Sequence, residues 1–227
     1  KEKRKALITK AVTKGLNPDV PMKDSEIEWL GEIPEPWEET RLRFLADINT
    51  GSKNTEDTEK DGEYPFYVRS PIIRSIDDYS YDEEAVLTSG DGAGVCEIYH
   101  YVNGKYELHQ RMYRITYFKE ILGRYLYYYM IANFKKDVMK FSAKSTVDSL
   151  RMHMFKNFPI VYGSKKEQEE IVNYIEDQEN RFESIISDLE TQIEKLKEYR
   201  QSIISAAVTG KIDVRDEVEI ESKEVMT

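Results

Sequence analysis

The sequence predicts an α+β protein in which one globular domain is followed by a long C-terminal coiled-coil helix. Residues 165–208 contain neither Pro nor Gly and repeat apolar residues every seven positions, as a coiled-coil helix does. Residues 41–162 instead carry short aromatic and β-branched runs separated by turn residues, which is typical of a sheet. One stretch of helical spacing, 119–140, is expected to pack on that sheet.

A repeat relates the first helix to the last. Residues 1–13 align without gaps to residues 197–209, and 7 of these positions are identical at a constant offset of 196. This predicts a structural unit of that length, running from helix end to helix end. Chance matching of two short basic helices is the alternative. Gly15 breaks the first helix, so residues 1–23 are expected to form a helix end and a linker.

The globular domain is expected over residues 24–162. Trp29 and Trp37 are expected to hold the linker onto it. Asn103-Gly104, between two Tyr-rich runs, predicts a hairpin turn. The expected strands are 64–69, 85–88, 95–102, 112–117 and 158–161.

The coiled-coil helix is expected over residues 163–211, with Ser164 as its N-cap and Glu167 as the capping-box partner. At 1.5 Å per residue it is roughly 65 Å long, so it requires a partner helix. Gln178 and Gln192 lie among the apolar positions and restrict register. Residues 212–227 are expected to be an acidic, mostly mobile tail. The expected coiled-coil interface is Ile171, Ile175, Phe182, Ile185, Leu189, Leu196 and Ile203.

Charge is distributed unevenly around a net −10. Residues 1–23 carry +5, residues 24–104 carry −14 and residues 105–160 carry +7. Nucleic-acid affinity depends on local basic surface, so the acidic total does not exclude it. Cys96 is the single cysteine, and no apolar run is long enough to span a membrane. We therefore expect a cytoplasmic protein with no membrane partner.

No catalytic pattern is found, so we expect no enzyme activity in this chain. The Gly-rich run 90–94 lacks the Lys of a phosphate-binding loop. His100, His109 and His153 have no metal-ligand spacing with one another or with Cys96. We accordingly expect no metal and no cofactor in this chain.

Basic and polar residues interleaved with aromatics on expected loops are the candidates for a nucleic-acid interface. Such side chains hydrogen-bond to base edges or bind phosphates. An ordinary solvated side chain is the alternative for each position. The candidates are Lys53, Asn54, Arg69, Ser70, Arg74, His109, Arg111, Lys144 and Ser145.

Several segments together resemble one family. Ser-Lys-Lys-Glu-Gln-Glu-Glu-Ile (164–171) begins the long helix, and Ile-Ile-Ser-Ala-Ala-Val-Thr-Gly-Lys (203–211) ends it. Arg-Lys-Ala-Leu-Ile-Thr-Lys-Ala-Val-Thr-Lys-Gly-Leu (4–16) is followed by Glu-Trp-Leu-Gly-Glu-Ile-Pro (28–34). These segments resemble the conserved helical regions, and the start of a target-recognition domain, of type I restriction-modification specificity subunits.

The resemblance implies DNA recognition without catalysis. Residues 24–162 would be the target-recognition domain, reading one half of a split double-stranded DNA site, and 163–211 a conserved helix. Modification subunits carrying S-adenosylmethionine would dock on the chain and methylate adenine, and a restriction/translocase subunit can join them. The chain would be either a half-subunit that associates with itself through the coiled coil or the second half of a longer subunit.

A rival interpretation is a non-enzymatic coiled-coil dimer whose domain binds a protein partner. The strongly acidic stretch 24–104 supports that rival.

Overall fold

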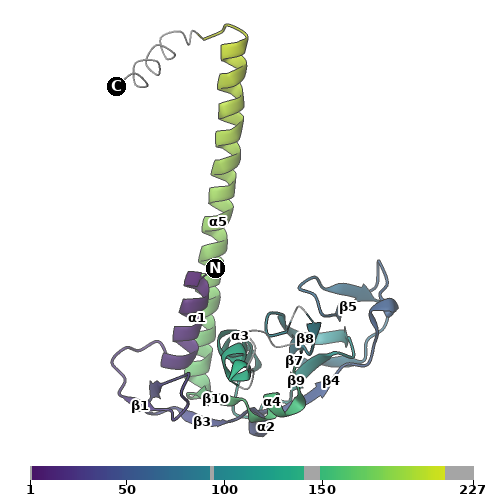
Figure 1. Ribbon diagram of the computed structural model, residues 1–227, viewed down its shortest axis with the longest axis vertical. Coiled ribbons are helices and arrows are strands. Elements are labelled where there is room, and N and C mark those ends of the chain that lie inside the picture. The colour runs from purple at the N-terminus through teal and green to yellow at the C-terminus, as the bar shows by residue number, and fades with distance from the viewer. Residues whose placement is uncertain (1, 93–94, 141–148, 213–227) are drawn as a thin grey trace. The chain divides into compact units, whose positions relative to one another are not determined.

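A computed structural model describes residues 2–92, 95–140 and 149–212 (Figure 1). The chain divides into two compact units, Lys1–Glu176 and Asp177–Thr227. The first unit combines strands and helices, and a long helix ends the described chain, which confirms the expected α+β class. No helix in the described ranges is both long and apolar enough to cross a bilayer.

A six-stranded sheet forms the centre of the first unit. Its strand order is β4-β9-β7-β8-β5-β6, and β5 and β8 run parallel while the other neighbours are antiparallel. β7 is central and ends in a fully buried run, because strands cover both its edges and α3 packs on it. The strands are β4 (Asp47–Thr50), β5 (Tyr64–Tyr67), β6 (Arg74–Ile76), β7 (Tyr81–Ser89), β8 (Tyr99–Leu108) and β9 (Met112–Thr116).

Two further antiparallel pairs lie outside this sheet. β1 (Met22–Asp24) pairs with β2 (Glu32–Pro34) where the linker enters the domain. β3 (Glu38–Arg41) pairs with β10 (Pro159–Tyr162), which joins the start of the domain to the segment before the long helix.

The helices of the first unit pack around α3. In Figure 1, α3 lies between α1 and strands β7 and β8. The buried hydroxyl of Tyr125 lies within hydrogen-bonding distance of the carbonyl oxygens of Val12 (3.0 Å) and Val161 (2.9 Å) and shares its one proton between them, so one side chain connects α1, α3 and β10. The helices are α1 (Glu2–Lys14), α2 (Leu42–Leu45), α3 (Gly123–Met139), α4 (Met152–Asn157) and α5 (Lys165–Val208), and Thr55–Asp57 forms a 3-10 turn.

The first turns of α5 are fixed inside the first unit. The Glu167 N–H donates to the Ser164 hydroxyl at 3.3 Å, as the expected N-cap requires. The Gln168 amide is buried, donates to the Gly163 and Glu120 carbonyls, and accepts from the Leu122 N–H. The base of the long helix is therefore part of the domain core.

The prediction of a hairpin turn at Asn103-Gly104 is wrong. Both residues lie inside β8, where Asn103 pairs with Glu84 and Gly104 with Glu83 of β7. Gly104 has φ +125°, which glycine adopts without steric cost, so the strand continues through it. Long-range pairing with β7 decided against the local turn signal. The tail expected at 212–227 lies, beyond Ile212, outside the described residues.

Candidate nucleic-acid interface

Segments distant in sequence meet beside one end of the β5–β8 pair. The backbone of Lys53 bridges to His109 at the turn between β8 and β9, and the His109 N–H donates to the Tyr67 carbonyl at 3.0 Å. The Gly90 N–H, after β7, donates to the Arg111 carbonyl at 2.8 Å. We call this set the loop cluster: residues 52–58, 68–74, 89–92 and 109–111.

Two arginines of the loop cluster share one carboxylate. Asp91 Oδ1 lies 2.5 Å from Arg69 Nη1, and Asp91 Oδ2 lies 3.2 Å from Arg111 Nη1. Asp91 is itself held, because its carbonyl accepts the Ser89 hydroxyl at 2.9 Å. Both guanidinium groups are thus placed on one side of the cluster while remaining partly open to solvent.

Asp91 was not among the candidates from the sequence. An acidic residue in a glycine-rich turn gives no local sign of a DNA interface, and only the structure shows that Asp91 pairs with two of the candidate arginines.

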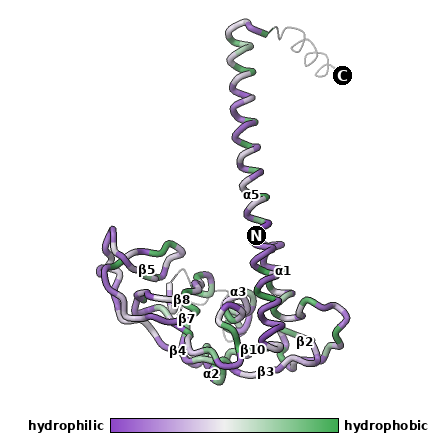
Figure 2. The backbone as a smooth tube through the Cα atoms, turned by 180° about the vertical axis from the view of Figure 1, so that it is seen from behind, coloured by the Kyte–Doolittle hydropathy of each residue, from purple (hydrophilic) through white to green (hydrophobic). Residues whose placement is uncertain are grey.

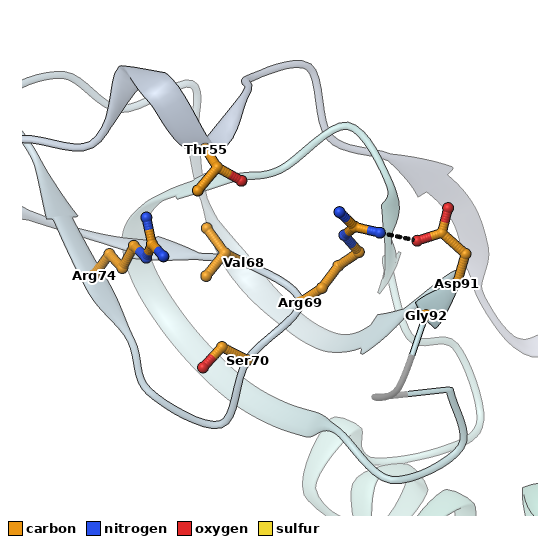
Figure 3. A pocket seen from close by; sticks show the side chains of 7 residues that line it. All are labelled: Thr55, Val68, Arg69, Ser70, Arg74, Asp91 and Gly92. Carbon is orange, nitrogen blue, oxygen red and sulfur yellow. Dashed lines mark hydrogen bonds and ion pairs between the residues drawn. The ribbon is translucent and has the colours of Figure 1, made fainter.

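A pocket of about 380 Å³ lies between Arg69 and Arg74 (Figure 3). Val68 forms part of its floor, Thr55 and Ser70 add polar atoms to its wall, and Arg74 Nη1 donates to the Thr58 hydroxyl at 3.3 Å. Figure 3 shows the Arg69 side chain directed toward Asp91, whereas Arg74 lies on the other side of Val68. A concave site lined by two guanidinium groups is chemically suited to an anion such as a phosphate.

His109 faces inward and is only 4% exposed. Burial, followed by the charges of Arg69 and Arg111, lowers the pKa of its imidazole. Its Nδ1 accepts the Arg111 N–H at 3.1 Å, which assigns this nitrogen as the unprotonated one. His109 therefore shapes the turn that presents Arg111 rather than offering its own ring to a ligand.

The polar candidates at the edge of the loop cluster mostly hold the loops together. The Gln110 side-chain amide donates to Asn54 Oδ1, and the Asn54 N–H donates to Asp57 at 2.7 Å. The Ser70 hydroxyl accepts the Ile72 N–H at 3.1 Å. Lys53 is half-buried beside them. Gln110 is a polar, exposed member of the cluster that the candidate set missed.

Seven of the nine candidates from the sequence thus lie in the loop cluster. The other two, Lys144 and Ser145, lie outside the described residues. No metal-binding set of His, Cys, Asp or Glu occurs within the part of the chain that the structure describes.

The expected coiled-coil positions divide into two groups. Ile171 and Ile175 are fully buried in the domain core, so they belong to that core and present no free seam. Phe182 is half-buried, and Ile185, Leu189, Leu196 and Ile203 are exposed along α5. The hydropathy of α5 alternates along its length in Figure 2, as an amphipathic helix requires.

Three further isoleucines widen the exposed apolar face of α5. Ile186, Ile193 and Ile204 are exposed and, at 100° per residue, fall on the same side of the helix as Leu189. The expected interface missed them because it followed only two positions of the seven-residue repeat, whereas Ile186 and Ile193 occupy a third position, three residues before and four residues after Leu189.

Known proteins resemble this chain over most of its length. A sequence model of the type I restriction modification DNA specificity domain matches residues 34–195. The specificity subunit of the type I restriction enzyme EcoDI from Escherichia coli is 27% identical over 182 residues, covering 80% of this chain and 40% of that protein.

Solved structures share the fold at low identity. The S subunit of a type I restriction-modification system from M. genitalium aligns with a TM-score of 0.55 at 14% identity, covering 71% of this chain and 45% of that one. The HsdS subunit from Thermoanaerobacter tengcongensis aligns with a TM-score of 0.59 at 15% identity, covering 93% of this chain and 52% of that one. A structure described as the structural basis of complex assembly and conformational transition of the type I R-M system aligns with a TM-score of 0.64 at 18% identity. It covers 91% of this chain and 52% of that one.

This chain therefore spans about half the length of these structural relatives, and less of the curated one. The family model covers well over half of the chain, across the sheet, α3 and the first part of α5. The chain belongs to the family of type I restriction-modification DNA specificity domains.

Proposed function

We propose that this chain reads one half of a split DNA site for a type I restriction-modification system and serves as a scaffold for its modification subunits. One observation carries the proposal: two separate segments, 68–74 and 109–111, bring Arg69, Arg74 and Arg111 to one edge of the domain. Guanidinium groups bind phosphates and the paired acceptors of guanine, so such a cluster supports both positioning and reading of DNA.

Family membership supports the same function. Within this proposal the chain itself is not catalytic and carries no cofactor. The modification subunits would hold S-adenosylmethionine and perform the methylation, and a restriction/translocase subunit would be a further partner.

The exposed face of α5 supports a scaffold role. Ile185, Leu189 and Leu196 lie on one side of the helix, and the described residues leave all three exposed. An isolated helix with such a face gains most of its stability from packing against another helix. In the proposed assembly, that partner is a second copy of this helix or the equivalent helix of a two-domain subunit.

The internal repeat extends this argument to the end of α5. Ile8 and Val12 of α1 are buried in the domain core, and the offset of 196 places Ile204 and Val208 at the equivalent positions. Those two residues are 43% and 82% exposed. The end of α5 would therefore pack on a second recognition domain in the way that α1 packs on this one, which sets the distance between two DNA half-sites.

The rival function, binding of a protein partner by the domain, is favoured by the net −14 of residues 24–104. The two functions differ in salt dependence. Binding to DNA releases counterions, so its affinity falls steeply and linearly on a log-log plot against salt. If the acidic stretch instead binds a protein partner, the chain should show no affinity for random duplexes at any salt concentration.

The test is a methylation assay with the assembled complex. The chain is mixed with the modification subunit of its system, labelled S-adenosylmethionine and DNA, and methylated adenines are mapped. Methylation at one split sequence that requires this chain would support the proposal, and an inverted repeat would indicate two copies. Arg111→Ala should weaken binding to that sequence at fixed salt. A complex that binds no DNA would overturn the proposal in favour of the protein-binding rival.

A further inference from the structure

The connection between β5 and β6 exposes two apolar side chains within the loop cluster. Ile72 is 73% exposed and Ile73 is 46% exposed. A single exposed apolar residue is common on protein surfaces, but two adjacent exposed isoleucines in a loop that also carries Arg69 and Arg74 are not explained by packing. These two residues are called the Ile pair below.

The loop that carries the Ile pair is held in place. The Ser70 N–H donates to the Val68 carbonyl at 2.6 Å, and the Ile72 N–H donates to the Ser70 hydroxyl at 3.1 Å. The Ser70 carbonyl lies 3.3 Å from Nε2 of His100, on β8. Pro71 further restricts the backbone immediately before the pair. The isoleucines are therefore presented by a supported loop, which lowers the entropic cost of using them for binding.

Cationic side chains flank the Ile pair on both sides. Arg69 precedes it and Arg74 follows it, and both line the same pocket. Arg111 lies beyond, on the other side of the carboxylate it shares with Arg69. An apolar loop tip that is flanked in sequence by two arginines complements a surface with anionic edges and an apolar interior. Duplex DNA has this form, because its phosphates border a stack of bases.

We propose that the Ile pair is a wedge that inserts against a base step of the recognised half-site, while Arg69 and Arg74 bind the adjacent phosphates. This inference rests on the proposed DNA-reading function and extends it to a mechanism of recognition. Isoleucine is among the apolar side chains that enter the minor groove, partly unstack a step and bend the duplex. Pyrimidine–purine steps unstack most easily, so the wedge selects a half-site containing a TA or CA step.

The experiment measures unstacking directly. Duplexes that bind the wild-type complex of this chain with its modification subunit are selected from a random pool, and 2-aminopurine is placed at each adenine of the selected half-site. Binding of the wild-type complex should raise the fluorescence of 2-aminopurine at one base step only, because the probe is unstacked there. Ile72→Ser combined with Ile73→Ser should abolish that rise and weaken binding on the order of tenfold. The salt dependence should stay unchanged because the arginines remain.

Tyr117→Ser provides the matched control. Tyr117 is also a large exposed side chain of the same unit, but it follows the end of β9 opposite to Arg111. This variant should keep the fluorescence rise and the affinity. Ile72→Ala alone should reduce the rise partially, which gives a graded response even where the double variant loses stability.

The outcomes separate the wedge from the function on which it rests. A wild-type complex that selects no sequence contradicts the DNA-reading function itself. A wild-type complex that selects a sequence but raises fluorescence at no step, or a double variant that retains the rise, overturns the wedge alone. A double variant that binds DNA as the wild type does but no longer retains the modification subunit also overturns it, and assigns the Ile pair to a protein contact.

Discussion

The indole N–H of Trp37 donates to Oε1 of Glu167 at 2.9 Å. Trp37 precedes β3 and is almost fully buried, whereas Glu167 lies in the first turn of α5. The bond therefore ties the beginning of the domain to the base of the long helix, 130 residues later in the chain.

Removing the acceptor of this bond should destabilise the first unit. Glu167→Ala leaves the buried indole N–H without a partner, and we expect a loss of about 1–3 kcal/mol in the free energy of unfolding. Glu167→Gln is the control, because its side-chain oxygen still accepts the bond. Urea unfolding followed by circular dichroism measures both variants. Equal stability of the alanine and glutamine variants would contradict this role of the bond.

Asp91 should reduce the affinity of the chain for non-specific DNA. Asp91→Asn removes the charge that pairs with Arg69 and Arg111, and this leaves both guanidinium groups available to phosphates. We expect higher affinity for random duplexes and a salt slope steeper by about 0.9 for each phosphate newly contacted. Binding measured at several salt concentrations tests this.

Asp177→Asn is the matched control for Asp91→Asn. Asp177 also pairs with an arginine, Arg181 at 2.9 Å, but it lies on α5 outside the loop cluster. It changes the net charge by the same amount and should leave the slope unaltered. If both variants bind random DNA equally well, total charge rather than the position of Asp91 is responsible.

The exposed face of α5 should mediate association. Leu189→Asp places a carboxylate in the middle of that face, and we expect it to abolish pairing of the helix because burying an unpaired charge is strongly unfavourable. Ser187→Asp is the control, since residue 187 falls on the opposite side of the helix. Mass in solution distinguishes the two variants. An unchanged mass for Leu189→Asp would remove this face from the proposed interface.

Stability should fall as the pH is lowered below neutrality. Burial lowers the pKa of both His100 and His109, so between their folded values and the unfolded value near 6.5 the unfolded chain binds more protons. Above about pH 7 both imidazoles are neutral in either state, so they do not reduce the free energy of unfolding. As the pH falls below the unfolded pKa of about 6.5 toward the folded values, that free energy decreases. Around His109, the positive charges of Arg69, Arg111 and Arg74 lower the pKa and Asp91 raises it.

Urea unfolding at pH 7.5 and 5.5 tests this dependence. The double variant His100→Gln, His109→Gln should lose less stability on acidification than the wild type. His153→Gln, which removes an exposed histidine on α4, should lose as much as the wild type. A double variant with the pH dependence of the wild type would show that other groups cause it.

The sequence by itself predicted the long helix and the approximate positions of five strands, but not β1, β2, β3, β4 and β6. Ser164, Glu167 and the absence of Pro and Gly through Val208 are local signals, and local hydrogen bonds of the helix backbone follow from them. The repeat at an offset of 196 was also a property of the sequence alone. The helical motifs carried the family resemblance, and the family comparison confirmed it.

Only the tertiary structure decided which residues meet. Asn103-Gly104 has the composition of a turn, yet pairing with Glu83 and Glu84 keeps it in a strand. Ile171 and Ile175 fit a coiled-coil pattern, but the domain core covers them, because an apolar residue packs against whichever surface approaches it.

The loop cluster is the clearest case of a site that local sequence does not specify. Asp91 lies 22 residues from Arg69 and 20 from Arg111, and no local pattern relates them. Their meeting depends on the strand order β9-β7-β8-β5, which places the ends of separate strands side by side. Strand order follows from long-range pairing and burial, and these physical terms act between segments rather than within them.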